Sequence, residues 1–344
     1  MIVTRKIRFR DFLVWSVPYF LIIAIYVGCI ALFYHYEIIN IGIPWLPISA
    51  IGTAVAFYVG FKNHQAYDRL WEARKIWGGI VNDSRTWGMM IDGYVTDQFS
   101  EKSISNDELE SIKKKLIYRH IAWLYAHRSQ LLVSTSWEHS SQEGLIGKMA
   151  KRYQKTHGVG LVDDEITRTE LKQFLPKDEH QRLLDRSNTA TQIINEQSRD
   201  LTELRKKNII DDFRHVELTN ILRSFYSLQG KNERIKKFPL PRQYANMSKY
   251  FVFIFIFLLP FSMVPELMKI TDLGLWLAIP LSGLIGWVYL MMENVGDYSE
   301  NPFQGMANDI PMMSMCRTIE IDLREMLGET DLPPTVKPKN GMLM

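Results

Sequence analysis

Cysteine is scarce in this sequence, and its two cysteines are far apart. Cys29 and Cys316 stand alone in 344 residues, with no C-x-x-C pair and no cysteine–histidine spacing typical of zinc ligands. Neither a disulfide framework nor a structural zinc site is therefore indicated. An excess of charge is missing as well. A net charge of +3 provides no electrostatic argument for binding nucleic acid.

The sequence also lacks the short motifs that mark common catalytic sites. No P-loop, G-x-S-x-G, H-E-x-x-H or C-x-x-C pattern occurs in it. His120 and His127 lie seven residues apart in a helix that we expect Asn106 to cap, and we interpret them as core or partner-facing side chains, not as metal ligands. An enzyme is therefore the least favoured class of function.

Long hydrophobic runs are absent from residues 62–249 but occur on both sides of that stretch. Four uncharged runs are candidate membrane spans: Phe12–Tyr36, Ile38–Phe61, Tyr250–Pro265 and Leu273–Met292. The third run is short, and snorkelling of Lys249 would help it to span. The first run lacks a convincing cleavage site, so we interpret it as a retained helix and not as a signal peptide.

Positive charges predict the orientation of these spans. Basic side chains precede the first span at Arg5, Lys6, Arg8 and Arg10, whereas the loop at Glu37 has no lysine or arginine. Because positive loops stay inside, we predict a multi-pass protein of the cell membrane with both termini in the cytoplasm. The predicted parts are spans one and two at 1–61, a helical cytosolic domain at 62–249, spans three and four at 250–292, a C-terminal helical segment at 293–328 and a disordered tail at 329–344.

The second span carries two ridges of residues at four-residue spacing. Its small residues, which permit close helix approach in lipid, are Gly52, Ala56 and Gly60. Its bulkier ridge, one position later, consists of Thr53, Phe57 and Phe61. If several copies surround one axis, the bulkier ridge lines that axis as apolar rings that control ions by dewetting. The alternative is an aromatic ridge that meets lipid or another helix, and spacing alone leaves both open.

Three segments resemble the signatures of one membrane-protein family. They are GFKNHQAYDRLWEARKIWG at 60–78, ERIKKFPLPRQY at 233–244 and NPFQGMANDIPMMSMCRTIEIDL at 301–323. They are similar to motifs of the bacterial bestrophins, in the right order over nearly the whole chain. The resemblance implies an all-α fold of four transmembrane helices and a helical cytosolic domain. It also implies a homo-pentamer around a central pore, with a neck at Thr53, Phe57 and Phe61.

The resemblance implies two further sites. Phe213 falls where bestrophins have a second constriction at the cytosolic exit, although the local pattern fits an ordinary core residue equally well. The neighbouring acids at 211 and 212 are either a ring at that exit or a pair at a helix N-terminus. Asn301 and Asp309 match the calcium-binding segment of eukaryotic bestrophins, but the residues between them lack carboxylates. We therefore expect no cofactor, with these two residues as weak calcium candidates.

The favoured function is a channel for small monovalent ions, either chloride or sodium and other cations. It would be a homo-oligomer in membrane lipid, without a nucleic-acid partner. Charge leaves the selectivity open, because Glu37, Glu266 and Asp272 in the outer loops favour cations whereas Lys62 below the neck favours anions. The alternative is a membrane-anchored scaffold or sensor that binds a cytosolic partner and conducts nothing.

Overall fold

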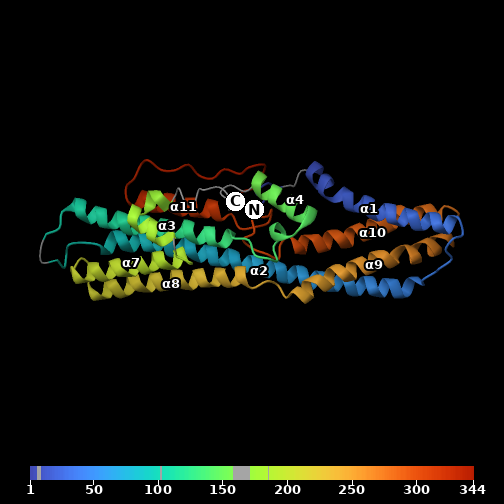
Figure 1. Ribbon diagram of the computed structural model, residues 1–344, viewed down its shortest axis with the longest axis horizontal. Helices are drawn as coiled ribbons and strands as arrows, with labels where there is room; N and C mark the ends of the chain where they lie inside the picture. Colours follow the sequence, from blue (N-terminus) through green and yellow to red (C-terminus); the bar gives the residue numbers. More distant parts are fainter. Residues whose placement is uncertain (6–8, 101–102, 158–170, 185) are drawn as a thin grey trace. The chain divides into compact units, whose positions relative to one another are not determined.

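The fold of this protein is built from α-helices (Figure 1). The computed structural model describes residues 1–5, 9–100, 103–157, 171–184 and 186–344. Its helices are α1 (Phe9–His35), α2 (Trp45–Tyr94), α3 (Asn106–Leu132), η1 (His139–Ser141), α4 (Gly144–His157), α6 (Lys177–Leu184), α7 (Thr189–Lys206), α8 (Asp212–Lys237), α9 (Arg242–Met268), α10 (Gly274–Asp297) and α11 (Met312–Met326). Among the described residues no β-strand is found, and β-structure is limited to isolated β-bridges. The prediction of an all-α fold is confirmed.

The chain divides into two compact units. The membrane unit consists of Thr4–Arg69 and Pro239–Asn301, and the polar unit of Met1–Val3, Leu70–Phe238 and Pro302–Met344. The sequence places the limits of the polar part at 62 and 249, whereas the structure places them at 70 and 238. The later limit differs because the polar start of α9, from Arg242, is continuous with the apolar part of that helix.

Among the described residues, the membrane unit contains four helices that are long and apolar enough to cross a bilayer, and each contains most or all of one predicted span. The second and third spans differ most from the prediction. The helix of the second span begins at Trp45 and not at Ile38, because Pro44 disfavours helix in the residue before it. Pro47 is tolerated in the first turn, where backbone N–H groups have no helical acceptor. The third span is not short, since α9 has 27 residues.

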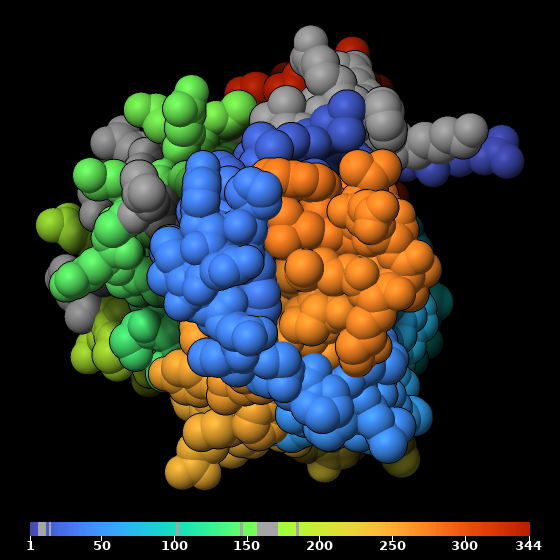
Figure 2. All heavy atoms as spheres, turned by 90° about the vertical axis from the view of Figure 1, so that its right-hand side faces the viewer, coloured from blue at the N-terminus to red at the C-terminus, as the bar shows by residue number. Residues whose placement is uncertain are grey.

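Small residues let α1 and α10 pack closely in this unit. A Cβ atom added at Gly283 would lie 3.1 Å from the Phe20 ring, and one added at Gly286 would lie 3.1 Å from Ile23. Close approach of this kind holds helices together where lipid removes the hydrophobic driving force. Figure 2 shows the blue segments of α1 and α2 beside the orange segments of α9 and α10 on the visible face of the molecule.

Proline also shapes the membrane unit, because it removes a helical hydrogen bond. Pro265 within α9 has no N–H to donate to the carbonyl of Phe261, one turn earlier. The backbone N–H of Ile43, in the loop before α2, donates to that carbonyl at 3.0 Å. An acceptor that would otherwise be unpaired in an apolar medium is therefore satisfied by a second segment, which ties the loop to α9.

Aromatic and histidine side chains fill the core of the polar unit. His120 and His127 lie on one face of α3, and both are buried. The ring of Trp123 stacks on both imidazoles, with centroid distances of 5.2 and 5.6 Å. His120 Nε2 lies 2.9 Å from Ser84 Oγ of α2. The helix itself is capped by Ser105, which accepts from the N–H of Glu108, and not by Asn106 as expected.

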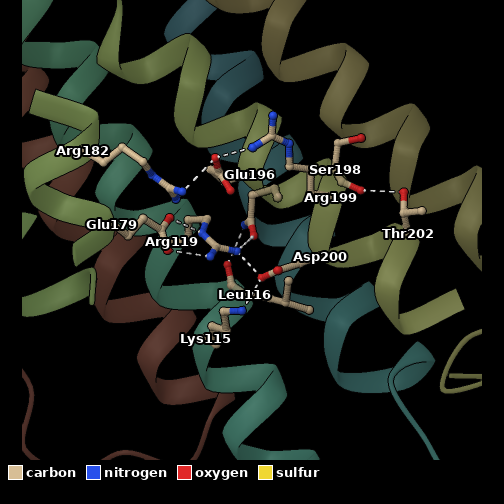
Figure 3. Close-up of polar contacts among 11 residues, drawn as sticks. Lys115, Leu116, Arg119, Glu179, Arg182, Glu196, Ser198, Arg199, Asp200 and Thr202 are labelled. Atoms are coloured by element: carbon tan, nitrogen blue, oxygen red, sulfur yellow. Dashed lines mark hydrogen bonds and ion pairs between the residues drawn. The ribbon is translucent and has the colours of Figure 1, made fainter. Parts of the chain in front are cut away.

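A buried arginine attaches α6 to its neighbours in the polar unit (Figure 3). Arg119 of α3 donates Nε and Nη2 to the two carboxylate oxygens of Glu179 in α6, at 2.7 and 2.8 Å. Its Nη1 donates to Asp200 of α7. Burial alone would raise the pKa of Asp200, but hydrogen bonds from Lys115 and Arg119 hold that pKa below its usual value. The bidentate pair of Arg119 with Glu179 fixes both the distance and the orientation between α3 and α6.

Residues 329–344 differ from the predicted disordered tail. At their start, Glu329 accepts a hydrogen bond from the Tyr118 hydroxyl at 2.6 Å and pairs with Lys114 at 2.8 Å. At the far end, the N–H of Leu343 donates to the carbonyl of Met1 at 2.8 Å. Composition alone predicts disorder, whereas contacts with distant residues supply the ordering free energy.

We predict that the polar unit loses stability in mild acid because of its buried histidines. Burial lowers the pKa of His120 to about 3 and that of His127 to about 4, although Glu233 acts in the opposite direction on His127. As the pH falls, these histidines therefore bind protons in the unfolded chain before they do so in the folded chain. Stability is full above the ordinary histidine pKa of 6.5 and falls as the pH drops toward the pKa values of the folded state. At about pH 5 the loss is about 2 kcal/mol per histidine.

Thermal melting of the purified protein in detergent, followed by tryptophan fluorescence across this pH range, measures the effect. His127→Gln should make the melting temperature less sensitive to pH, whereas His215→Gln, at a partly exposed position, should leave that sensitivity unchanged. Equal pH sensitivity in both variants would show that the buried imidazoles are not responsible.

Candidate functional site

One face of α2 in the membrane unit is left uncovered by the rest of the chain. Thr53, Phe57 and Phe61 all lie on it, and the two phenylalanines are 65% and 64% exposed. The opposite face is buried through Ile48, Val55, Val59 and Lys62. This division follows from the helical period, since positions four apart share one face. The structure therefore brings the three predicted neck residues together on one exposed stripe.

The Thr53 hydroxyl does not point freely out of this stripe. Its Oγ1 donates to the carbonyl of Ser49, one turn earlier, at 2.9 Å. A hydroxyl bonded in this way is satisfied within its own helix. The polar atom at the upper level of the predicted neck is therefore already engaged by the backbone.

The three small residues of α2 do not share one role. Gly52 is expected to permit close approach of another helix, and the helices that approach it belong to its own chain. A Cβ atom there would lie 2.8 Å from the ring of Phe255 in α9, and the Tyr289 hydroxyl of α10 donates to the Gly52 carbonyl at 3.0 Å. Gly60, in contrast, meets nothing within 4 Å, and Ala56 is partly exposed. Contact of Ala56 and Gly60 with another copy stays a prediction.

Lys62 points into the membrane unit and not toward the stripe. It is fully buried and forms an ion pair with Glu293 of α10, which is 2% exposed. Glu293 also accepts a hydrogen bond from Ser248 of α9. Lys62 and the two partners therefore join α2, α9 and α10 through one buried polar cluster. The expectation that Lys62 favours anions below the neck is wrong, because its charge is neutralised inside the protein.

The residue after Lys62 strengthens the same junction. Asn63 Nδ2 donates to the carbonyl of Met292 at 2.8 Å, and a Cβ atom at Gly296 would lie 1.9 Å from Asn63 Oδ1. Glycine at 296 is therefore required for this approach. The cluster could not be predicted from the sequence, because Lys62 and Glu293 are 231 positions apart. The helical spacing of Val55, Val59 and Lys62 was the one local signal that Lys62 faces inward.

Glu266, expected in an outer loop, lies in the last turn of α9 and gives weaker evidence on charge than the sequence suggests. Glu266 pairs with Lys269 at 2.8 Å, and both side chains are partly exposed. Its charge is largely offset by this neighbour, so it adds little to a preference for cations. Glu37 stands at a left-handed backbone position with φ of 56° and is exposed.

Phe213 lies in the first turn of α8 in the polar unit and is 84% exposed. The alternative that it is an ordinary core residue is wrong for this chain. Asp211 is the N-cap of α8, accepting from the N–H of Arg214 at 2.8 Å, and Asp212 pairs with Arg205 at 2.5 Å. The acids beside Phe213 therefore act as a helix N-terminal pair, while a constriction at Phe213 stays a prediction.

The two calcium candidates fall in different units, Asn301 in the membrane unit and Asp309 in the polar unit. Both oxygens of Asp309 accept backbone N–H groups, from Phe303 at 2.8 Å, Gly305 at 2.6 Å and Ile310 at 2.7 Å. Burial raises the pKa of Asp309, and these three hydrogen bonds act in the opposite direction. The carboxylate thus holds a turn in which Phe303 and Gly305 have positive φ. Within the described residues no group of three or more candidate ligands is found, and the weak calcium role of Asn301 and Asp309 stays a prediction.

The chain is similar to proteins of one family along most of its length. Residues 9–325 match the family model described as Bacterial/Fungal Bestrophin protein. The voltage-dependent anion channel-forming protein YneE of Escherichia coli is 24% identical over 303 residues, which cover 88% of this chain and 83% of that protein. A voltage-dependent anion channel-forming protein of Nostoc sp. is 27% identical over 277 residues, covering 80% and 75%. A solved bacterial bestrophin homologue from Klebsiella pneumoniae has a TM-score of 0.69 at 20% identity, over 92% of this chain and 99% of that chain.

We predict that Lys62→Met destabilises the membrane unit by about 3 kcal/mol or more, because it leaves a buried carboxylate without its cation. The double variant Lys62→Met with Glu293→Met should recover most of this loss, since no unpaired charge remains. Melting temperatures in detergent measure both effects. Lys269→Met, which breaks a partly exposed pair of the same unit, is the matched control and should change stability by about 1 kcal/mol or less. A double variant no more stable than the single one would contradict the pairing argument.

Proposed function

Since the chain belongs to the bacterial and fungal bestrophin family, we propose that it forms a homo-pentameric channel for small monovalent ions in the cell membrane. The observation that carries the proposal is the stripe on α2. Two large aromatic side chains, Phe57 and Phe61, are about two-thirds exposed on a helix whose other face is packed. The family match supports a channel and not an enzyme.

The proposed pore is built by symmetry. One copy contributes one stripe, and cyclic symmetry arranges the stripes of all copies around a common axis. Each level of Thr53, Phe57 and Phe61 then becomes a ring. Successive rings on the helix are four residues, or about 6 Å, apart along the axis. In this arrangement Ala56 and Gly60 face the neighbouring copy, where their small size permits close approach.

A neck of this kind acts on ions through water and through the edges and faces of aromatic rings. A narrow apolar ring disfavours water, so an ion that passes must lose part of its hydration shell. The positive edge of a phenylalanine ring attracts anions, and its negative face attracts cations. The relatives named as anion channel-forming proteins support chloride as one permeant ion. The aromatic neck itself is compatible with chloride and with sodium.

The remaining assignments follow from the same arrangement. Both termini and the polar unit lie on the cytoplasmic side, as the positive charges before α1 favour. Phe213, exposed at the start of α8, forms the second constriction at the cytosolic exit. The competing function, a scaffold or sensor that binds a cytosolic partner, shares the membrane helices but needs neither a central axis nor ion flux.

We predict that Phe57→Ala increases ion flux, because it removes the apolar obstruction from one ring of the neck. Purified protein reconstituted in liposomes with a trapped ion-sensitive dye measures the flux. Phe253→Ala is the matched control, since Phe253 is a similarly exposed phenylalanine on α9, 57% exposed, outside the proposed neck. Equal flux in wild type and Phe57→Ala would argue against a neck at this level. No flux in any variant would favour the scaffold.

The detergent-solubilised protein should have the mass of five copies of the 40.2 kDa chain. Native mass spectrometry measures this directly, with the detergent removed in the gas phase. A monomer at all protein concentrations would contradict the symmetric pore, because one copy leaves its α2 stripe uncovered.

A further inference from the structure

The exposed stripe of α2 does not end at Phe61. His64 and Asp68, the next positions on the same face of the helix, are 72% and 60% exposed. The two side chains form a pair one turn apart, with 3.3 Å between His64 Nε2 and Asp68 Oδ2. His64 lies three residues beyond Phe61, or about 4.5 Å further along the helix axis. An ionisable pair therefore follows directly on the apolar part of the stripe.

Three other basic side chains of the membrane unit near this level form ion pairs with acidic side chains. Lys62 is buried against Glu293. The two basic residues at the start of α9 bind acids at the end of α10 or just beyond it: Lys249 pairs with Asp297 at 2.7 Å and Arg242 with Glu300 at 2.8 Å. Arg69, beside Asp68, is partly buried and has an interaction of its own. The net charge presented at this level of the stripe is therefore set mainly by His64 and Asp68.

We propose that His64 and Asp68 form a charged ring at the inner mouth of the neck and determine which ions enter it. This inference rests on the proposed channel function. When the imidazole is neutral, each copy presents one carboxylate, and the ring attracts small monovalent cations and repels anions. When the imidazole is protonated, each pair has no net charge, and the preference for cations weakens. Protonation of the imidazole by acid therefore couples the selectivity of this ring to pH.

Reversal potentials in planar bilayers under a potassium chloride gradient test the proposal. For the wild-type protein, the ratio of potassium to chloride permeability should fall when the pH is lowered from about 7.5 to about 5.5. Asp68→Asn should lower that ratio about fivefold at the higher pH, since it removes the carboxylates from the mouth. His64→Gln should keep the preference for cations but abolish its response to pH. Asp68→Asn thus tests the source of the cation preference, and His64→Gln tests the response of that preference to pH.

Matched controls use exposed groups of the same unit that lie off the stripe. Glu266→Gln removes a partly exposed, lysine-paired carboxylate, and His35→Gln removes an exposed histidine at the end of α1. Both should keep the wild-type ratio and its pH response. Since His64 and Asp68 are exposed, their variants should also keep the wild-type melting temperature, so a change in selectivity would not reflect loss of the fold.

Three outcomes would overturn the inference in different ways. Unchanged selectivity and pH response in Asp68→Asn and His64→Gln, with Phe57→Ala still raising the flux, would overturn the charged mouth and leave the channel intact. An unchanged ratio in Asp68→Asn together with an altered one in Glu266→Gln would place the selecting charge at the C-terminal end of α9. A wild-type protein that carries no current at any pH would overturn the channel function and the ring together.

Discussion

The buried ion pair between Lys62 and Glu293 is the interaction on which the candidate site depends. A charge among membrane helices is tolerated only with a partner, so Lys62 has to meet α10 and cannot turn outward. The link through Ser248 adds α9 to the same contact. This fixes the rotation of α2 about its own axis in the membrane unit. In that rotation the phenylalanines of the stripe are uncovered, and so are His64 and Asp68, one and two turns beyond Phe61.

The need to satisfy polar groups recurs through the rest of the structure. In the membrane unit, the carbonyl that Pro265 leaves without a donor is bonded by Ile43. In the polar unit, Asp309 accepts three backbone N–H groups and so stabilises a turn that the family resemblance links to calcium. Arg119 is buried only because Glu179 and Asp200 surround it. In each place a buried polar group has its bonding capacity used within the fold.

Several features could be predicted from the sequence because they depend on neighbouring residues. Four spans follow from uncharged runs, and the common face of Thr53, Phe57 and Phe61 follows from the helical period. The role of Gly52 could not be predicted in the same way. Its spacing shows that a helix approaches there but not which one, and the approaching residue is Phe255 of the same chain. The N-cap of α3 differs by one residue because serine and asparagine are both good caps.

The sequence by itself determined the class of fold, the four spans, the aromatic stripe and the family, since all of these are carried by local periodicity and continuous motifs. Tertiary structure alone decided which charges reach the stripe. Lys62 and Asp68 are six residues apart on one helix, yet one is buried in an ion pair and the other is exposed beside His64. The difference arises because burial of a charge depends on a partner brought from 231 residues away, and no local pattern records that encounter.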